Sequence, residues 1–141
     1  MKTLFTIVAV FFSFNAYSQT LSFAELVHLH SRKDAEKFLI SKSFTSLRAP
    51  AYNGKNLEYV INSRTENEEE IDISGQSGIA YMTRNPEYVK FLLNQIKTKY
   101  HKVSGFDEPN FKFYQFGDPN FLITVNLEKG KTRHSIAIEW K

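Results

Sequence analysis

The stretch Asn85–Tyr100, NPEYVKFLLNQIKTKY, decides the fold because it predicts the clearest helix in the chain. Asn85 is a favourable N-cap, and Pro86 suits the first helical position, where a missing N–H costs nothing. Apolar residues then recur at spacings of three and four, which is one face of a helix: Val89, Leu92, Leu93, Ile96 and Tyr100. We therefore expect an amphipathic helix that buries this stripe and stops near Gly105.

After this helix, the sequence alternates between apolar and polar residues, which is typical of half-buried strands. The runs from Phe111, from Phe121 to Leu127 and from Ile136 to Trp140 each predict one strand. Turn-forming residues separate them at Gly117–Asn120 and Glu128–Lys131. The segment therefore predicts a three-stranded meander.

A similar order precedes the central helix. The pattern Ser22-x-x-Glu25 is a capping box for a first helix, and a second helix follows Ser31–Asp34. The segment from Phe44 to Asn56 is rich in Ser, Pro, Gly and Asn and predicts a loop. Alternating runs predict strands that begin at Leu57, Ile71 and Ile79, and the acidic run Thr65–Glu70 predicts a solvated hairpin tip.

The predicted fold class is α+β, with helices packed on one face of an antiparallel sheet. Residues 19–141 form one domain, in which 19–84 and 85–141 are candidate half-repeats, each a helix followed by a meander. Matching residues lie 53 to 57 positions apart, by subtraction, as in Phe38 with Phe91, Tyr59 with Phe113 and Ile79 with Ile136. The alternative is that any chain of helices and meanders shows such offsets.

This repeated order in a small exported chain resembles the β-lactamase-inhibitor-protein-like architecture, which small outer-membrane assembly factors share. The resemblance covers residues 19–141 and implies tandem units of a helix and a meander. The chain departs from it by having no cysteine and no lipid anchor. No functional residue is carried over from it.

The first 18 residues predict a cleaved signal peptide. Lys2 supplies a positive start, Leu4–Phe14 is uncharged and largely apolar, and Ala16–Ser18 places small residues at the cleavage site before Gln19. A membrane anchor is the alternative, but this apolar run is short of the about 20 residues that span a bilayer. We expect a periplasmic or secreted protein without a membrane span.

Composition and charge disfavour several classes of function. Loss of Lys2, with no acid in residues 1–18, lowers the formal charge from +3 to +2, which does not indicate a nucleic-acid partner. The absence of cysteine excludes disulfides, thiol catalysis and thiolate metal sites. No Gly-rich phosphate loop is present, so no cofactor is predicted.

No metal or catalytic residue is assigned either. His28 and His30 lie about 200° apart on a helix, which separates them as ligands. The acidic run lacks the Gly and the spacing of a calcium loop. Ser77 can be combined with His101 or His134 into a triad, but no nucleophile elbow surrounds it. A pair of carboxylates that meets only in space stays open.

The sequence predicts a contact surface on the sheet face opposite the helices. If Phe111 and Phe113 face the helices, then Tyr114 and Phe116 lie on the outer face, beside Leu122. An aromatic outer face is typical of a binding surface, although loops or a terminus are an alternative cover. We expect a small exported, non-enzymatic module that contacts another envelope or secreted protein, as an inhibitor or immunity factor does. The alternatives are a binder of a small apolar ligand or an envelope polymer, and a hydrolase with a spatial carboxylate site.

Overall fold

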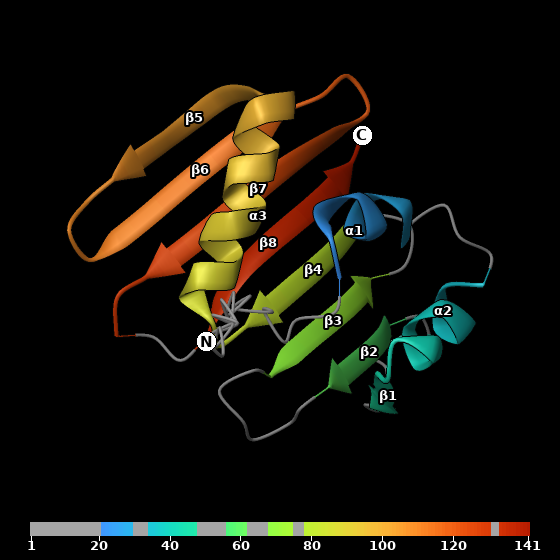
Figure 1. The fold of residues 1–141 in the computed structure, drawn as a ribbon. Coiled ribbons are helices and arrows are strands. Elements are labelled where there is room, and N and C mark those ends of the chain that lie inside the picture. The colour runs from blue at the N-terminus through green and yellow to red at the C-terminus, as the bar shows by residue number, and fades with distance from the viewer. Residues whose placement is uncertain (1–20, 30–33, 48–55, 62–67, 75–77, 131–132) are drawn as a thin grey trace, which may run out of the picture.

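The computed structural model describes residues 21–29, 34–47, 56–61, 68–74, 78–130 and 133–141, which form helices over one antiparallel sheet (Figure 1). The helices of this part of the chain are α1 (Phe23–Leu29), α2 (Ala35–Ser41) and α3 (Pro86–Lys99). Its strands are β1 (Thr45–Leu47), β2 (Asn56–Ile61), β3 (Glu69–Ser74), β4 (Gly78–Thr83), β5 (His101–Asp107), β6 (Phe111–Gly117), β7 (Phe121–Glu128) and β8 (His134–Trp140).

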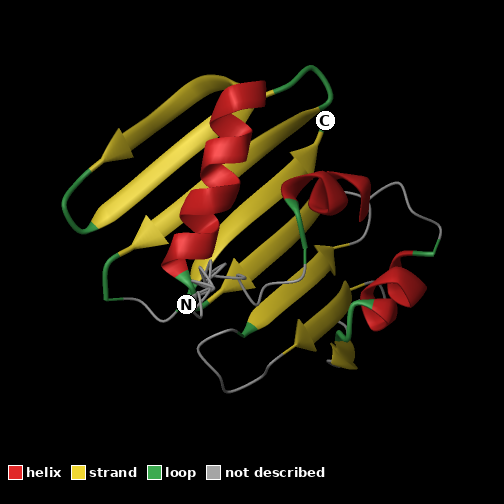
Figure 2. Cartoon of the chain, in the orientation of Figure 1, coloured by secondary structure: helices red, strands yellow, loops and turns green. Residues whose placement is uncertain are grey.

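The strand order is β1-β2-β3-β4-β8-β7-β6-β5, and every neighbouring pair is antiparallel. Two meanders, β1–β4 and β5–β8, therefore meet through their last strands at the middle of the sheet. Figure 2 shows α1 and α3 together on one face of this sheet, with α2 near β1. The predicted α+β class, with helices on an antiparallel sheet, is confirmed.

Each meander has four described strands, whereas the sequence predicted three. The extra strand β1 lies in the segment predicted as a loop, and the extra strand β5 contains the predicted helix stop, Gly105. The backbone of Tyr100 is already extended at φ −120° and ψ 148°. The chain thus passes from α3 straight into β5 and needs no glycine to end the helix. The internal duplication itself stays a prediction.

The central helix follows its sequence closely. The Asn85 side chain accepts hydrogen bonds from the backbone N–H groups of Glu87 and Tyr88, at 3.0 and 3.3 Å. Pro86 occupies the first turn. The buried residues of α3 are Tyr88, Val89, Leu92, Leu93 and Ile96. They pack over β4, β7 and β8, so the predicted stripe is the layer that joins the two meanders.

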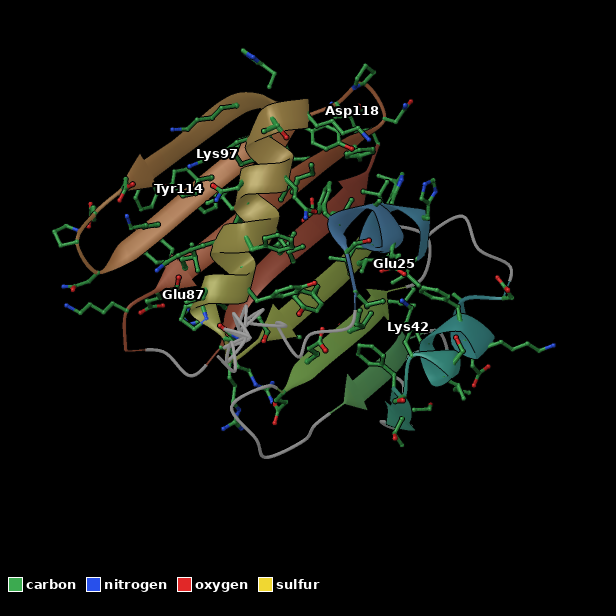
Figure 3. The ribbon with its side chains drawn as sticks, viewed as in Figure 1. Glu25, Lys42, Glu87, Lys97, Tyr114 and Asp118 are labelled. Atoms are coloured by element: carbon green, nitrogen blue, oxygen red, sulfur yellow. The ribbon has the colours of Figure 1, made fainter. Side chains whose placement is uncertain are left out.

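Two contacts connect the N-terminal part of the described chain to other helices. The capping box forms as predicted, because Glu25 accepts from the backbone N–H of Ser22 at 2.7 Å while Ser22 Oγ caps Glu25 N–H at 3.3 Å. Glu25 also pairs with Lys42 at 2.7 Å, which links α1 to the end of α2 (Figure 3). The hydroxyl of Tyr88 donates to the carbonyl of Leu21, so α3 holds the segment that enters α1.

The prediction of a solvated tip is wrong for Glu68, Glu69 and Glu70, which are buried at the start of β3. Glu69 accepts a hydrogen bond from the hydroxyl of Tyr81 at 2.9 Å. Glu68 and Glu70 both pair with Arg133, at 2.9 and 2.7 Å. Specific partners of this kind offset the cost of removing a carboxylate from water. Residues 62–67 lie outside the described part of the chain.

Residues 1–20, with the predicted signal peptide, also lie outside the described residues. None of the described helices combines the length and apolarity needed to cross a membrane.

Candidate functional site

The prediction that Tyr114 and Phe116 lie on the outer face of the sheet is wrong. Tyr114 is 7% exposed and Phe116 is 1% exposed, and both belong to the core. Tyr114 stands opposite Val125, and Phe116 opposite Ile123, so all four share the face that α3 covers. Because side chains alternate along a strand, Phe111 and Phe113 take the outer face instead.

The inversion arises because β6 reads FKFYQFG and is aromatic on both faces. Alternation alone predicts two sets of side chains but not which set is covered. The neighbouring strand β7 resolves the ambiguity, since its buried residues are Phe121, Ile123, Val125 and Leu127, as its pattern predicts. Leu122, the third predicted contact residue, is half-buried and shares a face with Phe111 and Phe113.

Tyr114 can be buried because its hydroxyl group has a hydrogen-bond partner. Its hydroxyl donates to Asp107 at 2.6 Å, and the ammonium groups of Lys97 and Lys102 are 5.1 and 5.2 Å from its ring centre. Figure 3 shows Lys97 on α3 near Tyr114. The hydrogen bond to Asp107 and burial raise the pKa of Tyr114 to about 12, and bonds from Tyr114 and Lys112 lower the pKa of Asp107. Tyr114 therefore fastens α3 to β5 and β6.

The outer face of β5, β6 and β7 carries a cluster of apolar side chains that we name the outer-face strip. Phe106 lies 5.4 Å from both Phe111 and Phe113 by ring centroids. Phe106 and Val103 are 47% and 63% exposed, which is unusual for residues of this size. The strip consists of Val103, Phe106, Phe111, Phe113 and Leu122.

An irregularity in β5 brings Val103 into the strip. The pairing of β5 with β6 shifts between Lys102 and Ser104, so Val103 is an extra residue in the strand. A Cβ added to Gly117 would lie 2.8 Å from Cγ2 of Val103, which shows that Val103 covers Gly117. Gly117 stands opposite Leu122, so Val103 and Leu122 lie in one row of the outer face.

On the helix-side face, β5 has a glycine in place of an apolar side chain. Gly105 has φ +144°, and a Cβ there would lie 2.5 Å from the carbonyl oxygen of Phe113. Only glycine accepts this conformation and this close approach. The bulge and Gly105 together turn the apolar residues of β5 outward.

Several uncharged polar side chains lie beside the strip on the outer face of β6–β8. Gln115, Thr124, Asn126 and Ser135 lie in the rows beside it, and the Asn126 amide donates to Ser135 at 3.3 Å. On the outer face of β6–β8 the charged residues are Glu128 and Glu139, toward the strand ends. An apolar centre with few charges around it is characteristic of protein–protein interfaces.

A separate pocket of about 370 Å³ lies beside the start of α3. Leu127, Pro86 and Pro109 give it apolar walls, and it is also lined by Arg84, Lys90, Lys112, Lys129, Glu128 and His134. Three of these cations already have acidic partners: Arg84 with Glu68 at 3.3 Å, Lys90 with Glu87 at 2.6 Å and Lys112 with Asp107 at 2.9 Å. Its charges are thus largely balanced.

One of the residues that line this pocket, His134, is titratable and has a hydrogen-bond partner on β7. Its Nδ1 accepts a hydrogen bond from the backbone N–H of Glu128 at 3.4 Å, which leaves the proton of the neutral ring on Nε2. Burial, and then the charge of Lys90, lower the pKa of His134. The pocket therefore contains a neutral hydrogen-bond donor beside apolar walls.

The other candidates from the sequence do not gather into a site. His28 and His101 are exposed on separate elements, whereas His30 and Ser77 lie outside the described residues. Within the described ranges, no three His, Asp or Glu side chains are placed to hold a metal ion together. Glu68 and Glu70 share Arg133, an arrangement that fits a structural ion pair.

No protein-family model, curated protein or solved structure matches this chain.

Sequence reasoning missed Val103 and Phe106, the most exposed members of the strip. The run HKVSGFD does not alternate, because the bulge places Val103 and Phe106 on one face at a spacing of three. The signal that could have found them is Gly105 in a strand, since glycine within a strand often marks a bulge.

Proposed function

We propose that this protein is a small exported binding module that contacts another protein through the outer-face strip. The observation that carries the proposal is the contact of three Phe side chains on a sheet face that no described helix covers. Export follows from the predicted signal peptide, with cleavage before Gln19 into the periplasm or the medium. A role as an inhibitor or immunity factor fits such a module.

The surroundings of the strip favour a protein partner over a lipid surface. Membrane-surface binding relies on Lys and Arg around the apolar residues, because they meet anionic headgroups. The outer face of β6–β8 instead has a neutral polar rim and two acidic residues at its ends. Phe rings in such a rim provide contact area with little loss of conformational entropy.

The test compares the substitution of Phe by Ser in the strip with the same substitution on α3. Phe111→Ser with Phe113→Ser removes the inner part of the strip, whereas Phe91→Ser removes an exposed Phe from the outward side of α3. We expect the double variant to weaken capture of the partner by at least about 2 kcal/mol, or about 30-fold in Kd. The Phe91→Ser variant should bind as the wild type does. Partner capture from envelope extract, followed by titration of the captured protein, measures both.

Thermal unfolding of the same variants is the control for folding. If the double variant is folded and binds its partner with unchanged affinity, the strip is not the binding surface. A larger loss of affinity in the Phe91→Ser variant would indicate that the binding surface lies on α3.

The pocket beside α3 favours a second candidate function, the binding of a small ligand. Its apolar walls and its donors from lysine and from His134 fit a compact apolar molecule with one acidic group. Small organic acids should then raise the unfolding temperature of the wild type but not that of a Leu127→Glu variant. An equal response of the two proteins would count against a ligand in this pocket.

A further inference from the structure

Within the described ranges, strand β5 forms a free edge of the sheet. Among the described strands it is the last in the order and pairs with β6 alone, and all but one of its residues are exposed. The backbone groups on its outer side are available to another strand, and edges of this length are templates for strand addition.

The sequence of this edge is complementary to itself. Read from His101 to Glu108, HKVSGFDE runs basic, basic, apolar, small, then small, apolar, acidic, acidic. In an antiparallel pair with its own copy, Lys102 stands opposite the partner's Asp107, and Val103 opposite the partner's Phe106. His101 stands opposite the partner's Glu108, and two-fold symmetry repeats each pair. Opposite charges and apolar pairs directly across strands are the combinations that stabilise a sheet.

The faces of the paired residues agree as well. Lys102 and Asp107 both contact Tyr114 and lie on the helix side of β5. Val103 and Phe106 both lie in the outer-face strip. Residues opposite each other in a sheet must share a face, and the pairs Lys102–Asp107 and Val103–Phe106 satisfy this rule. The register shift lies at Val103, and the central pair, Ser104 with Gly105, is the one that does not share a face.

The charges of Lys102 and Asp107 also disfavour the pairing of β5 with strands from other proteins. A lysine on an edge normally prevents strand addition, because its charge is left without a partner. Here Asp107 of a second copy provides that partner, and its carboxylate is half exposed beside Lys112. The apolar contact also grows, because the outer-face strips of two copies become continuous across the axis.

We propose that β5 pairs antiparallel with β5 of a second copy, so that the protein is a homodimer with one continuous sheet. Val103 and Phe106 belong to both surfaces, but this inference is tested separately from the proposed function, because its variants change Lys102 and Asp107 and leave Phe111 and Phe113 intact.

The experiment uses charge exchange between two variants. Lys102→Glu places Glu opposite the partner's Asp107, and Asp107→Lys places Lys opposite the partner's Lys102. Each variant alone should dissociate at least about tenfold more readily than the wild type, since two attractive pairs become repulsive. Mixed together, the two variants should dimerise again, because every opposed pair is then of opposite charge. Lys129→Glu, in the turn after β7, is the matched control and should dimerise normally.

Sedimentation velocity over a concentration series measures all of these, on the full chain purified as the cell processes it. A wild type that stays monomeric at high concentration overturns the proposal, and so does a Lys102→Glu variant with unchanged dimerisation. Failure of the folded mixture to dimerise also overturns it.

Asp107→Lys removes the acceptor of the Tyr114 hydroxyl and is therefore checked by thermal unfolding. If it does not fold, Asp107→Asn replaces it, because Asn retains an oxygen for Tyr114. A mixture of Asp107→Asn with Lys102→Glu should dimerise more tightly than Lys102→Glu alone. Equal affinities would contradict the proposed pairing.

Discussion

The two faces of β6 contain the same kind of side chain and have opposite roles. On the helix side, Tyr114 and Phe116 are buried under α3. On the outer side, Phe111 and Phe113 form the outer-face strip with Phe106 of the edge strand. The difference is set by what covers each face, since the residue types alone are nearly equivalent. Predictions that exchange or remove these aromatics therefore test the face assignment directly.

The largest expected effect is the difference between Phe116→Ala and Phe113→Ala. Phe116 is fully buried, so its loss removes burial and leaves a cavity, at a cost of about 3–5 kcal/mol. Phe113 faces the outer side, and its loss should cost about 1 kcal/mol or less. Urea titrations of the two variants measure the difference. Equal losses of stability in the two variants would show that Phe116 and Phe113 are equally buried.

A smaller effect is expected from the glycine that turns β5. Gly105→Ala requires a positive φ for alanine and brings its Cβ within 2.5 Å of a carbonyl oxygen. We expect a loss of about 1–3 kcal/mol. Gly130→Ala is the matched control, because Gly130 also has a positive φ, of +81°, but has open space around it. Its loss should be the smaller one in urea titration, and the reverse order would show that the approach to β6 is not tight.

The smallest effect concerns the hydrogen bond between Tyr114 and Asp107, and it depends on pH. The pKa of Tyr114 is raised from 10.0 to about 12, so this bond stabilises the fold fully below pH 10 and is lost as pH rises toward 12. The pKa of Asp107 is lowered from 3.8, so its share is present above that value and is lost as pH falls below it. The stability difference between wild type and Tyr114→Phe should thus be constant from about pH 5 to 9 and shrink on both sides.

Urea midpoints of both proteins across this pH range measure that difference. A difference that does not change with pH would show that the bond does not contribute to folding.

Much of the fold follows from the sequence where one face of an element is apolar and the other is polar. The stripe of α3, its Asn85 cap and the alternation of β7 each have a single solution, and the structure confirms them. Prediction fails at β6, since both of its faces are aromatic, and at β5, since a bulge disrupts the alternation. It also fails at Glu68–Glu70, whose partners Arg133 and Tyr81 come from distant positions in the chain.

The sequence predicted an aromatic outer face, but of the residues that form it only Leu122 was named. Phe111 and Phe113 were assigned to the core, and Phe106 was missed. Only the pairing of β6 with β7 and the position of α3 distinguish the two sets, and both are long-range features.

Hydroxyl-radical footprinting with mass spectrometry, read at single residues of the folded protein, tests this division of β6 most directly. Oxidation rates follow the exposure of each ring. The structure predicts that Phe106, Phe111 and Phe113 are modified readily, that Phe116 is protected, and that addition of the partner protects the first three. Modification of Phe116 at the rate of Phe113 would contradict the account.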